Sequence, residues 1–211
     1  TGVFLGDTVS GRRCCRTATV GVYPSRLPIG LKLLPGLSKR NLILAYSRKG
    51  ENMKAVELYN LGRDFFEERE WKKAVGCFNR ALRADPAFVD ALFKRAESYR
   101  RLGEEGKSIR DYTEVIDRDP LYFMAYYRRG KVYCSREKPR YDLAMRDFNK
   151  AVRLRPDDCR GYRGRASVNY RTARYSKVIG DCSRSLRLEP DCAFLHVLRG
   201  MSYLLEKRSS A

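Results

Sequence analysis

Several features that mark common protein classes are scarce or missing in this 211-residue sequence. It has one histidine, His196, and its seven cysteines include no Cys-x-x-Cys pair, so no zinc-binding spacing is present. The odd number of cysteines and the adjacent Cys14 and Cys15 argue against a disulfide framework and favour a reducing compartment. No run approaches the roughly 18–20 apolar residues of a membrane-spanning helix, so no membrane span is expected.

Sequence patterns of catalysis are also missing. The sequence contains no Gly-rich phosphate loop, no paired metal motif and no histidine-based triad. Glu67, Glu68 and Glu70 lie near the end of a predicted helix, where solvated acids are a simpler explanation than an acid–base pair. We therefore expect a non-enzymatic protein without a cofactor.

Acidic residues are few relative to basic ones. The chain has 25 Asp and Glu against 44 Lys and Arg, which gives a net charge of +19 and favours acidic partners. Residues 1–50 hold nine Lys or Arg and one acid, Asp7, and the prolines at 24, 28 and 35 interrupt every helical period there. We expect this segment to be an extended, basic N-terminal arm that docks on an acidic partner. Its candidate docking residues are Arg12, Arg13, Arg16, Arg26, Lys32, Lys39 and Arg40.

The rest of the chain is a repeat with a period of about 34 residues. Its markers are Pro86, Pro120, Pro156 and Pro190, each of which stops a helix and begins the next unit. Such a period is typical of stacked helical hairpins. The predicted array covers 51–207, with units at 55–88, 89–122, 123–158 and 159–192, a half unit at 193–207 and a tail at 208–211. Two extra residues of the third unit are placed in the turn at 135–140.

The pattern inside each unit resembles the tetratricopeptide repeat. In the first unit the matching places hold Leu58, Leu61, Gly62, Phe65, Trp71, Ala74, Phe78, Ala81 and Pro86. The resemblance implies an all-α, right-handed superhelical solenoid of about four and a half helix-turn-helix units. One difference from the family pattern recurs: the place that holds leucine in the first unit, Leu61, holds arginine in the later units. These arginines are Arg95, Arg129, Arg165 and Arg199.

In this family the first helices of the units line a concave groove. The resemblance places twelve candidate binding residues there: Tyr59, Asn60, Arg63, Phe93, Lys94, Arg100, Tyr127, Arg128, Lys131, Arg160, Arg163 and Tyr170. Cations interleaved with aromatic rings suit an acidic peptide that also carries apolar side chains. We interpret the chain as a protein–protein interaction scaffold. Charge reversal at Arg128, Arg160 and Arg163 is expected to weaken partner binding without unfolding the array.

One subfamily clamps the acidic C-terminal tails of heat-shock chaperones, using lysine, asparagine and arginine at five fixed places. In this sequence those places hold Tyr59, Arg63, Lys94, Met124 and Arg128, and only Arg128 matches in kind. A chaperone-tail cochaperone is therefore disfavoured.

Alternative functions stay open at this point. The last predicted helix is apolar almost all round, so further repeats, the arm or a partner should cover it. The chain opens at Thr1, which favours a processed chain or a piece of a longer one. A structural subunit of a large assembly, axonemal, microtubule-associated or mitochondrial ribosomal, is one alternative, and an RNA-binding helical-repeat protein is another. The expected location is the cytoplasm or cytoskeleton, cilium included, with the mitochondrion as the alternative.

Overall fold

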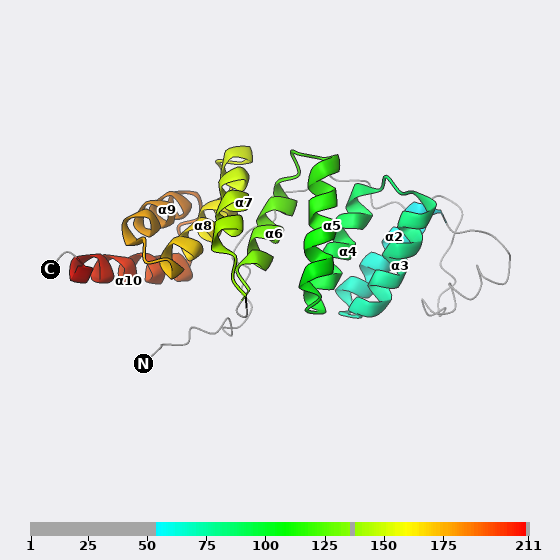
Figure 1. Ribbon diagram of the computed structural model, residues 1–211, viewed down its shortest axis with the longest axis horizontal. Helices are drawn as coiled ribbons and strands as arrows, with labels where there is room; N and C mark the ends of the chain where they lie inside the picture. Colours follow the sequence, from blue (N-terminus) through cyan, green and yellow to red (C-terminus); the bar gives the residue numbers. More distant parts are fainter. Residues whose placement is uncertain (1–53, 136–137, 210–211) are drawn as a thin grey trace.

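The computed structural model describes residues 54–135 and 138–209 (Figure 1). Within these ranges the chain forms nine α-helices: α2 (Ala55–Glu67), α3 (Trp71–Ala84), α4 (Val89–Arg101), α5 (Glu105–Arg118), α6 (Phe123–Tyr133), α7 (Tyr141–Leu154), α8 (Cys159–Arg171), α9 (Tyr175–Leu188) and α10 (Ala193–Ser209). The arm predicted for residues 1–50 lies outside the described residues.

The helices stack as hairpins in a single row. The pairs α2–α3, α4–α5, α6–α7 and α8–α9 pack together, each hairpin packs on the next, and α10 packs on α9. Figure 1 shows the row running from α2 at one end to α10 at the other. The predicted all-α, right-handed superhelical solenoid of about four and a half units is confirmed.

Apolar periodicity and Asp-Pro or related turns define the helices. In α7 the apolar residues at helical spacing, Ala144, Phe148 and Ala151, are buried. The polar residues Asp142, Arg146 and Arg153 are exposed. Helices α3 and α5 end before Asp85 and Asp119, whose Oδ1 atoms accept hydrogen bonds from backbone N–H groups two residues later, at 3.0 Å each. The carboxylate thus stabilises the turn that the following proline starts.

Short turns join the two helices within a hairpin. Three of the four connections contain three residues, 68–70, 102–104 and 172–174, whereas 134–140 joins α6 to α7. The longer connection lies where the sequence placed its two extra residues. Each short turn has one left-handed residue: Arg69 (φ 62°), Gly103 (φ 78°) and Ala173 (φ 55°).

Small residues allow the helices of a hairpin to cross closely. A Cβ atom at Gly62 would lie 2.6 Å from Cε1 of Phe78, and one at Gly130 would lie 2.9 Å from Cε1 of Phe148. Both distances are too short for a real Cβ contact. The aromatic ring of the second helix therefore lies directly on the glycine of the first.

Buried side chains form a nearly continuous core along the row. Leu82 packs against both the core of the first hairpin and that of the two central hairpins. The helical cysteines belong to this core, since Cys77 and Cys182 are buried, and burial raises the pKa of the Cys182 thiol to about 12. Buried thiols of this kind act as small apolar residues.

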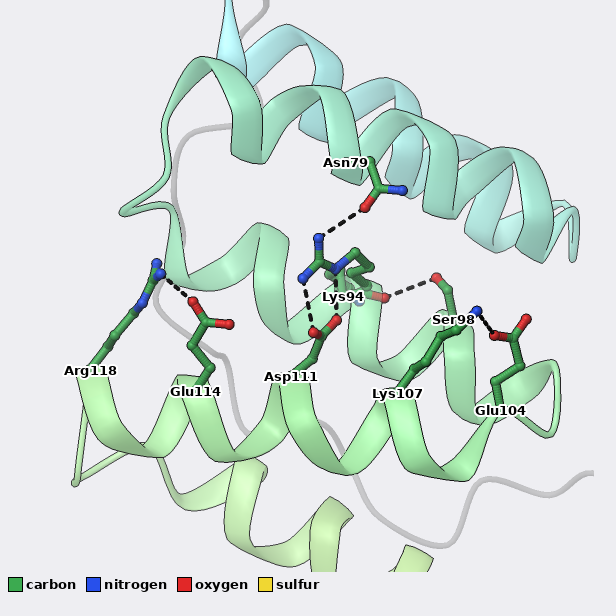
Figure 2. Close-up of polar contacts among 9 residues, drawn as sticks. Asn79, Lys94, Ser98, Glu104, Lys107, Asp111, Glu114 and Arg118 are labelled. Carbon is green, nitrogen blue, oxygen red and sulfur yellow. Dashed lines mark hydrogen bonds and ion pairs between the residues drawn. The ribbon is translucent and has the colours of Figure 1, made fainter.

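A partly buried arginine connects three helices at each of the three junctions between hairpins. In the second hairpin, Arg95 donates from Nε and Nη2 to the two carboxylate oxygens of Asp111, at 2.7 and 2.9 Å. Its third nitrogen, Nη1, donates to Oδ1 of Asn79 in the preceding hairpin, at 2.9 Å. The dashed lines in Figure 2 join Asp111 and Asn79 to this one guanidinium. We call the arrangement an arginine bridge.

The bridge recurs in the next two hairpins. Arg129 donates to both oxygens of Asp147, at 2.9 and 2.8 Å, and to the Thr113 hydroxyl, at 2.8 Å. Arg165 donates likewise to Asp181 and, at 3.0 Å, to Oδ1 of Asn149. These arginines stand where the resembled family has leucine. In each of these hairpins the arginine is accompanied by an aspartate in the second helix, with which it forms an ion pair.

The burial of the aspartates limits how much the arginine bridge stabilises the fold. The side chains of Asp111, Asp147 and Asp181 are 5–7% exposed. Burial raises the pKa of Asp111 and of Asp147 even beside their guanidinium partners, so desolvation opposes much of the attraction. We infer that the main role of the bridge is to fix the register of neighbouring hairpins. Loss of one partner would destabilise the array, because it would leave the other partner as a buried, unpaired charge.

Replacing Arg129 by leucine tests this account. Arg129→Leu leaves Asp147 buried without a cation, and we expect the free energy of unfolding in urea to fall by about 3–5 kcal/mol. The double variant Arg129→Leu/Asp147→Cys reproduces the Leu61 and Cys77 pair of the first hairpin and should recover most of the loss. Arg146→Leu, on the exposed side of α7, is the control and should change little. An Arg129→Leu variant as stable as the parent would contradict the bridge.

Candidate functional site

The first helices of the hairpins form one continuous side of the row. Helix α2 contacts α4, α6 contacts α8, and an ion pair between Arg128 and Glu97 joins α6 to α4. We call the side formed by α2, α4, α6 and α8 the first-helix surface. Helical spacing brings the residues at i, i+3 and i+4 of each helix to this side.

The structure separates the twelve predicted binding residues by burial. Asn60, Arg63 and Lys131 are exposed, and Tyr59, Lys94, Arg100, Arg128, Arg160, Arg163 and Tyr170 are partly buried. Phe93 and Tyr127 are only 8% and 4% exposed, which corrects their assignment as contact residues. Their rings pack on Tyr112 and Phe148 of the second helices, at centroid distances of 5.7 and 6.1 Å.

A buried carboxylate organises the middle of the first-helix surface. Glu97 is 5% exposed and accepts a hydrogen bond from the Tyr112 hydroxyl. Its oxygen Oε1 lies 3.4 Å from Nε of Arg100 and 3.5 Å from Nε of Arg128. Burial disfavours its charged form, but the two guanidinium groups and the tyrosine outweigh burial and hold the pKa of Glu97 below its ordinary value.

Lys94 is a partly buried cation of this surface. Its Nζ lies 5.0 Å from the centroid of the Phe66 ring, in a cation–π contact. Desolvation lowers the pKa of Lys94, the nearby Arg63 and Arg128 lower it further, and Glu97 and Glu67 partly oppose the shift. A carboxylate brought beside Lys94 would therefore meet cations from three successive hairpins.

The cations of α8 are tied to the protein. Asp158 caps this helix by accepting from the Arg160 backbone N–H at 2.9 Å, and it also binds the Arg160 guanidinium through both carboxylate oxygens. Arg163 donates from Nη2 to the Tyr127 hydroxyl at 3.2 Å. Reversing Arg128, Arg160 and Arg163 would therefore also remove internal contacts of the array, so the expectation that this variant keeps the array folded stays a prediction.

The remaining candidate sites do not involve the predicted binding residues. Two hollows of about 330 and 250 Å³ are lined by none of the twelve predicted residues. In the described part of the chain, no three His, Cys, Asp or Glu side chains gather in a way that could hold a metal ion. None of the helices within residues 54–135 and 138–209 has the length and apolar character needed to cross a bilayer. The seven predicted arm residues, Arg12 to Arg40, lie outside these ranges.

Comparisons with known proteins agree with this architecture. The family described as Tetratricopeptide repeat matches residues 59–109 and 106–158. The Hsp70-Hsp90 organizing protein 2 of Arabidopsis thaliana is 30% identical over 97 residues, which are 46% of this chain and 17% of that protein. Across the curated relatives described, the match spans 17–33% of their length.

Solved structures show the same fold. A tetratricopeptide repeat protein from Parabacteroides merdae superimposes with a TM-score of 0.68 at 22% identity, covering 82% of this chain and 67% of that one. The first TPR of Spaghetti (RPAP3), bound to the HSP90 peptide SRMEEVD, gives a TM-score of 0.54 at 23% identity, covering 58% of this chain and 96% of that one.

The Glu97 cluster predicts a pH-dependent stability difference. Glu97→Gln leaves Arg100 and Arg128 without their shared counter-charge, and we expect a loss of about 1.5–3 kcal/mol at pH 7. Because the folded pKa of Glu97 lies below its ordinary value of 4.5, its contribution is complete above that pH and disappears as the pH falls through the folded value. The gap between parent and variant should therefore close in acid.

Urea unfolding at a series of pH values from 7 to 3 measures this gap. Glu105→Gln, an exposed position on α5, is the control and should follow the parent. A difference that stays constant from pH 7 to pH 3 would show that the charge of Glu97 does not stabilise the fold.

Proposed function

Because the chain belongs to the tetratricopeptide repeat proteins, we propose that it is a non-enzymatic protein–protein interaction scaffold that binds an acidic peptide on its first-helix surface. The shared repeat and the relatives that carry it support the scaffold role. The acidic ligand is inferred from the charges of this chain.

One observation carries the choice of an acidic ligand. Lys94 is desolvated between Arg63 and Arg128, so these three cations repel one another in the free protein. The single buried acid among them, Glu97, already binds Arg100 and Arg128. A carboxylate of the ligand would add to the counter-charge that Glu97 and Glu67 already provide, and charge-assisted hydrogen bonds of about 1.5–3 kcal/mol each would favour binding.

The aromatic rings beside these cations add a second requirement. Phe66 and Tyr59 are partly buried and lie against Lys94 and Arg63, respectively. A ligand with apolar side chains next to its acids would contact both kinds of group. The HSP90 peptide SRMEEVD bound by the similar RPAP3 domain has that composition. The chaperone clamp places differ here, so we propose an acidic peptide of a different sequence for this chain.

The basic segment at residues 1–50 extends the proposal. Its charge, eight more Lys and Arg than Asp and Glu, suits a second contact with the same acidic partner or with a larger assembly. We place the protein in the cytoplasm or on the cytoskeleton. A structural subunit anchored by this arm and an RNA-binding protein are the outcomes that would replace the peptide scaffold.

Peptide titration tests the first-helix surface. Labelled SRMEEVD serves here as a probe of acidic and apolar composition rather than as the native ligand. In fluorescence anisotropy it should bind, and the acid-free peptide SRMQQVN should bind at least about tenfold more weakly, a difference of about 1.4 kcal/mol. The variant Arg63→Glu/Lys94→Gln/Lys131→Glu should weaken SRMEEVD binding by about tenfold or more, because it removes cations from three first helices.

A charge-matched control separates this surface from the overall charge. The variant Lys72→Glu/Arg184→Glu/Lys177→Gln makes the same change in net charge on exposed parts of the second helices. It should keep parental affinity and melting temperature. Equal losses in both variants would reject the first-helix surface as the binding site.

Deleting residues 1–50 tests the arm. The full chain and the deletion variant are each used to capture partners from extract, with and without nuclease. We expect the full chain to retain its protein partners after nuclease treatment. The deletion variant should lose those partners that bind through residues 1–50. Partners that disappear entirely with nuclease would make nucleic acid the ligand and the scaffold proposal wrong.

A further inference from the structure

Six cations form two rows along the second helices α7 and α9. Helical spacing brings the members of each row to one face of its helix. Five of the six side chains are exposed, and that of Lys150 is partly buried. We call these residues the second-helix stripe: Arg146, Lys150 and Arg153 of α7, and Lys177, Arg184 and Arg187 of α9.

The acids of α7 and α9 do not neutralise the second-helix stripe. Asp147 and Asp181 are buried and bound by Arg129 and Arg165, which leaves Asp142 as the exposed acid of the two helices. In the described residues no carboxylate forms an ion pair with any of the six cations. The positive charge of the stripe is therefore available to an anionic ligand.

Helix α5 interrupts this pattern and so limits the extent of the stripe. Glu114 and Asp117 of α5 stand at the places that Lys150 and Arg153 hold in α7. Helix α3 carries a further basic row, but α5 lies between α3 and α7 in the stack. Among the second helices within the described ranges, α7 and α9 are therefore the adjacent pair in which both rows lack acids.

The arginine bridge fixes the two rows relative to each other. Arg165 donates to Oδ1 of Asn149 in α7, at 3.0 Å, and to both carboxylate oxygens of Asp181 in α9. Asn149 immediately precedes Lys150, and Asp181 lies about one helical turn before Arg184. A ligand thus meets cations whose backbone positions are already ordered, which lowers the entropic cost of binding.

The second-helix stripe offers charge without apolar contacts. The exposed large apolar side chains of the described residues all lie outside α7 and α9, whereas the first-helix surface pairs its cations with aromatic rings. A ligand of dense, regular negative charge fits the stripe better than a peptide that needs apolar anchors. Four of the six cations are arginines, whose planar fork binds two phosphate oxygens at once.

The same composition favours a double-stranded ligand. Single-stranded nucleic acid is held largely by bases that stack on aromatic side chains, and the six stripe residues include no aromatic ring. A duplex keeps its bases inside and presents phosphates at fixed spacing to the protein. Two rigid rows of cations match two rigid strands of phosphates.

We propose that the second-helix stripe binds the phosphate backbone of a nucleic-acid duplex without reading its base sequence. The rows extend about 10 Å along α7 and about 15 Å along α9, at about 1.5 Å per residue. Over such a length a duplex carries roughly six to nine phosphates, enough for all six cations. Contacts to phosphates position a duplex but do not specify its sequence. The stripe is separate from the first-helix surface, so nuclease-resistant protein partners remain expected.

The salt dependence of duplex binding tests the stripe. The full chain and its variants are titrated into a labelled RNA duplex of about 16 base pairs, at about 50 to 200 mM salt, and followed by fluorescence anisotropy. Arg146→Gln/Arg153→Gln/Lys177→Gln should weaken binding at least about tenfold and make the slope of log affinity against log salt shallower by about 2.7. Its melting temperature should match that of the parent, because all three side chains are exposed. Residues 1–50 are the same in every variant, so the differences report on the array.

A matched control separates the stripe from the overall charge. Arg63→Gln/Arg101→Gln/Lys131→Gln removes the same charge, from the same residue types, at exposed positions of the first helices. It should keep duplex affinity within about twofold of the parent. Equal losses in the two triple variants would overturn the proposal, because attraction to the net positive charge would then explain the binding.

A second variant tests the stripe in the opposite direction. Glu114→Lys/Asp117→Arg gives α5 the residues that α7 carries at the same places. It extends the stripe by a third row and should steepen the salt slope by about 1.8. An unchanged slope would contradict the placement of the duplex along the second helices.

The choice of ligand completes the test. A DNA duplex of the same sequence and an RNA duplex of another sequence should bind within about threefold of the first, and saturating SRMEEVD should not displace any of them. Tighter binding of the single strand, or a strong preference for one sequence, would overturn backbone recognition of a duplex. Polyglutamate or anionic lipid vesicles that bind as tightly as the duplex would assign the stripe to an acidic protein or a membrane surface instead.

Discussion

The arrangement of the hairpins depends on a guanidinium group that holds three helices at once. Arg95, Arg129 and Arg165 each meet a carboxylate of their own hairpin with two nitrogens and keep a third for the hairpin before. A leucine at this place can fill space but cannot select one register over another. The planar fork can, because its hydrogen bonds fail when either neighbour slides by a single helical turn.

This constraint also shapes the outer chemistry of the molecule. Asp111, Asp147, Asp181 and Glu97 form internal ion pairs and are buried, so these four negative charges are not presented to solvent. Lysines and arginines remain on the surface, and the first-helix surface is basic for this reason as well as from composition.

The sequence predicted the hairpins well because their determinants are local. Proline spacing, small residues at crossings and apolar periodicity all report on contacts within one hairpin or between neighbours, and the structure confirms these elements. The arginines were noticed only as departures from the resembled repeat. Their meaning lies in the recurrence of aspartate 16 or 18 residues later, a signal that is readable once both helices are known to face each other.

The candidate site was harder to predict, for a physical reason. Phe93 and Tyr127 occupy the border between the first-helix surface and the hairpin crossing, and helical spacing alone does not say which side covers them. The aromatic ring of the second helix decides the matter by packing on them. Likewise, the role of Glu97 depends on Arg128, which comes from the following hairpin and is distant in sequence.

The buried cysteines have a practical consequence for studying the motions of the array. Cys77, Cys159, Cys182 and Cys192 are spread over the first hairpin and the C-terminal end, and all four are buried. Because thiol reagents attack exposed thiolates, each of these groups becomes reactive only when its own part of the array opens. Alkylation rates, followed cysteine by cysteine, would therefore time the local openings at the two ends without any added label.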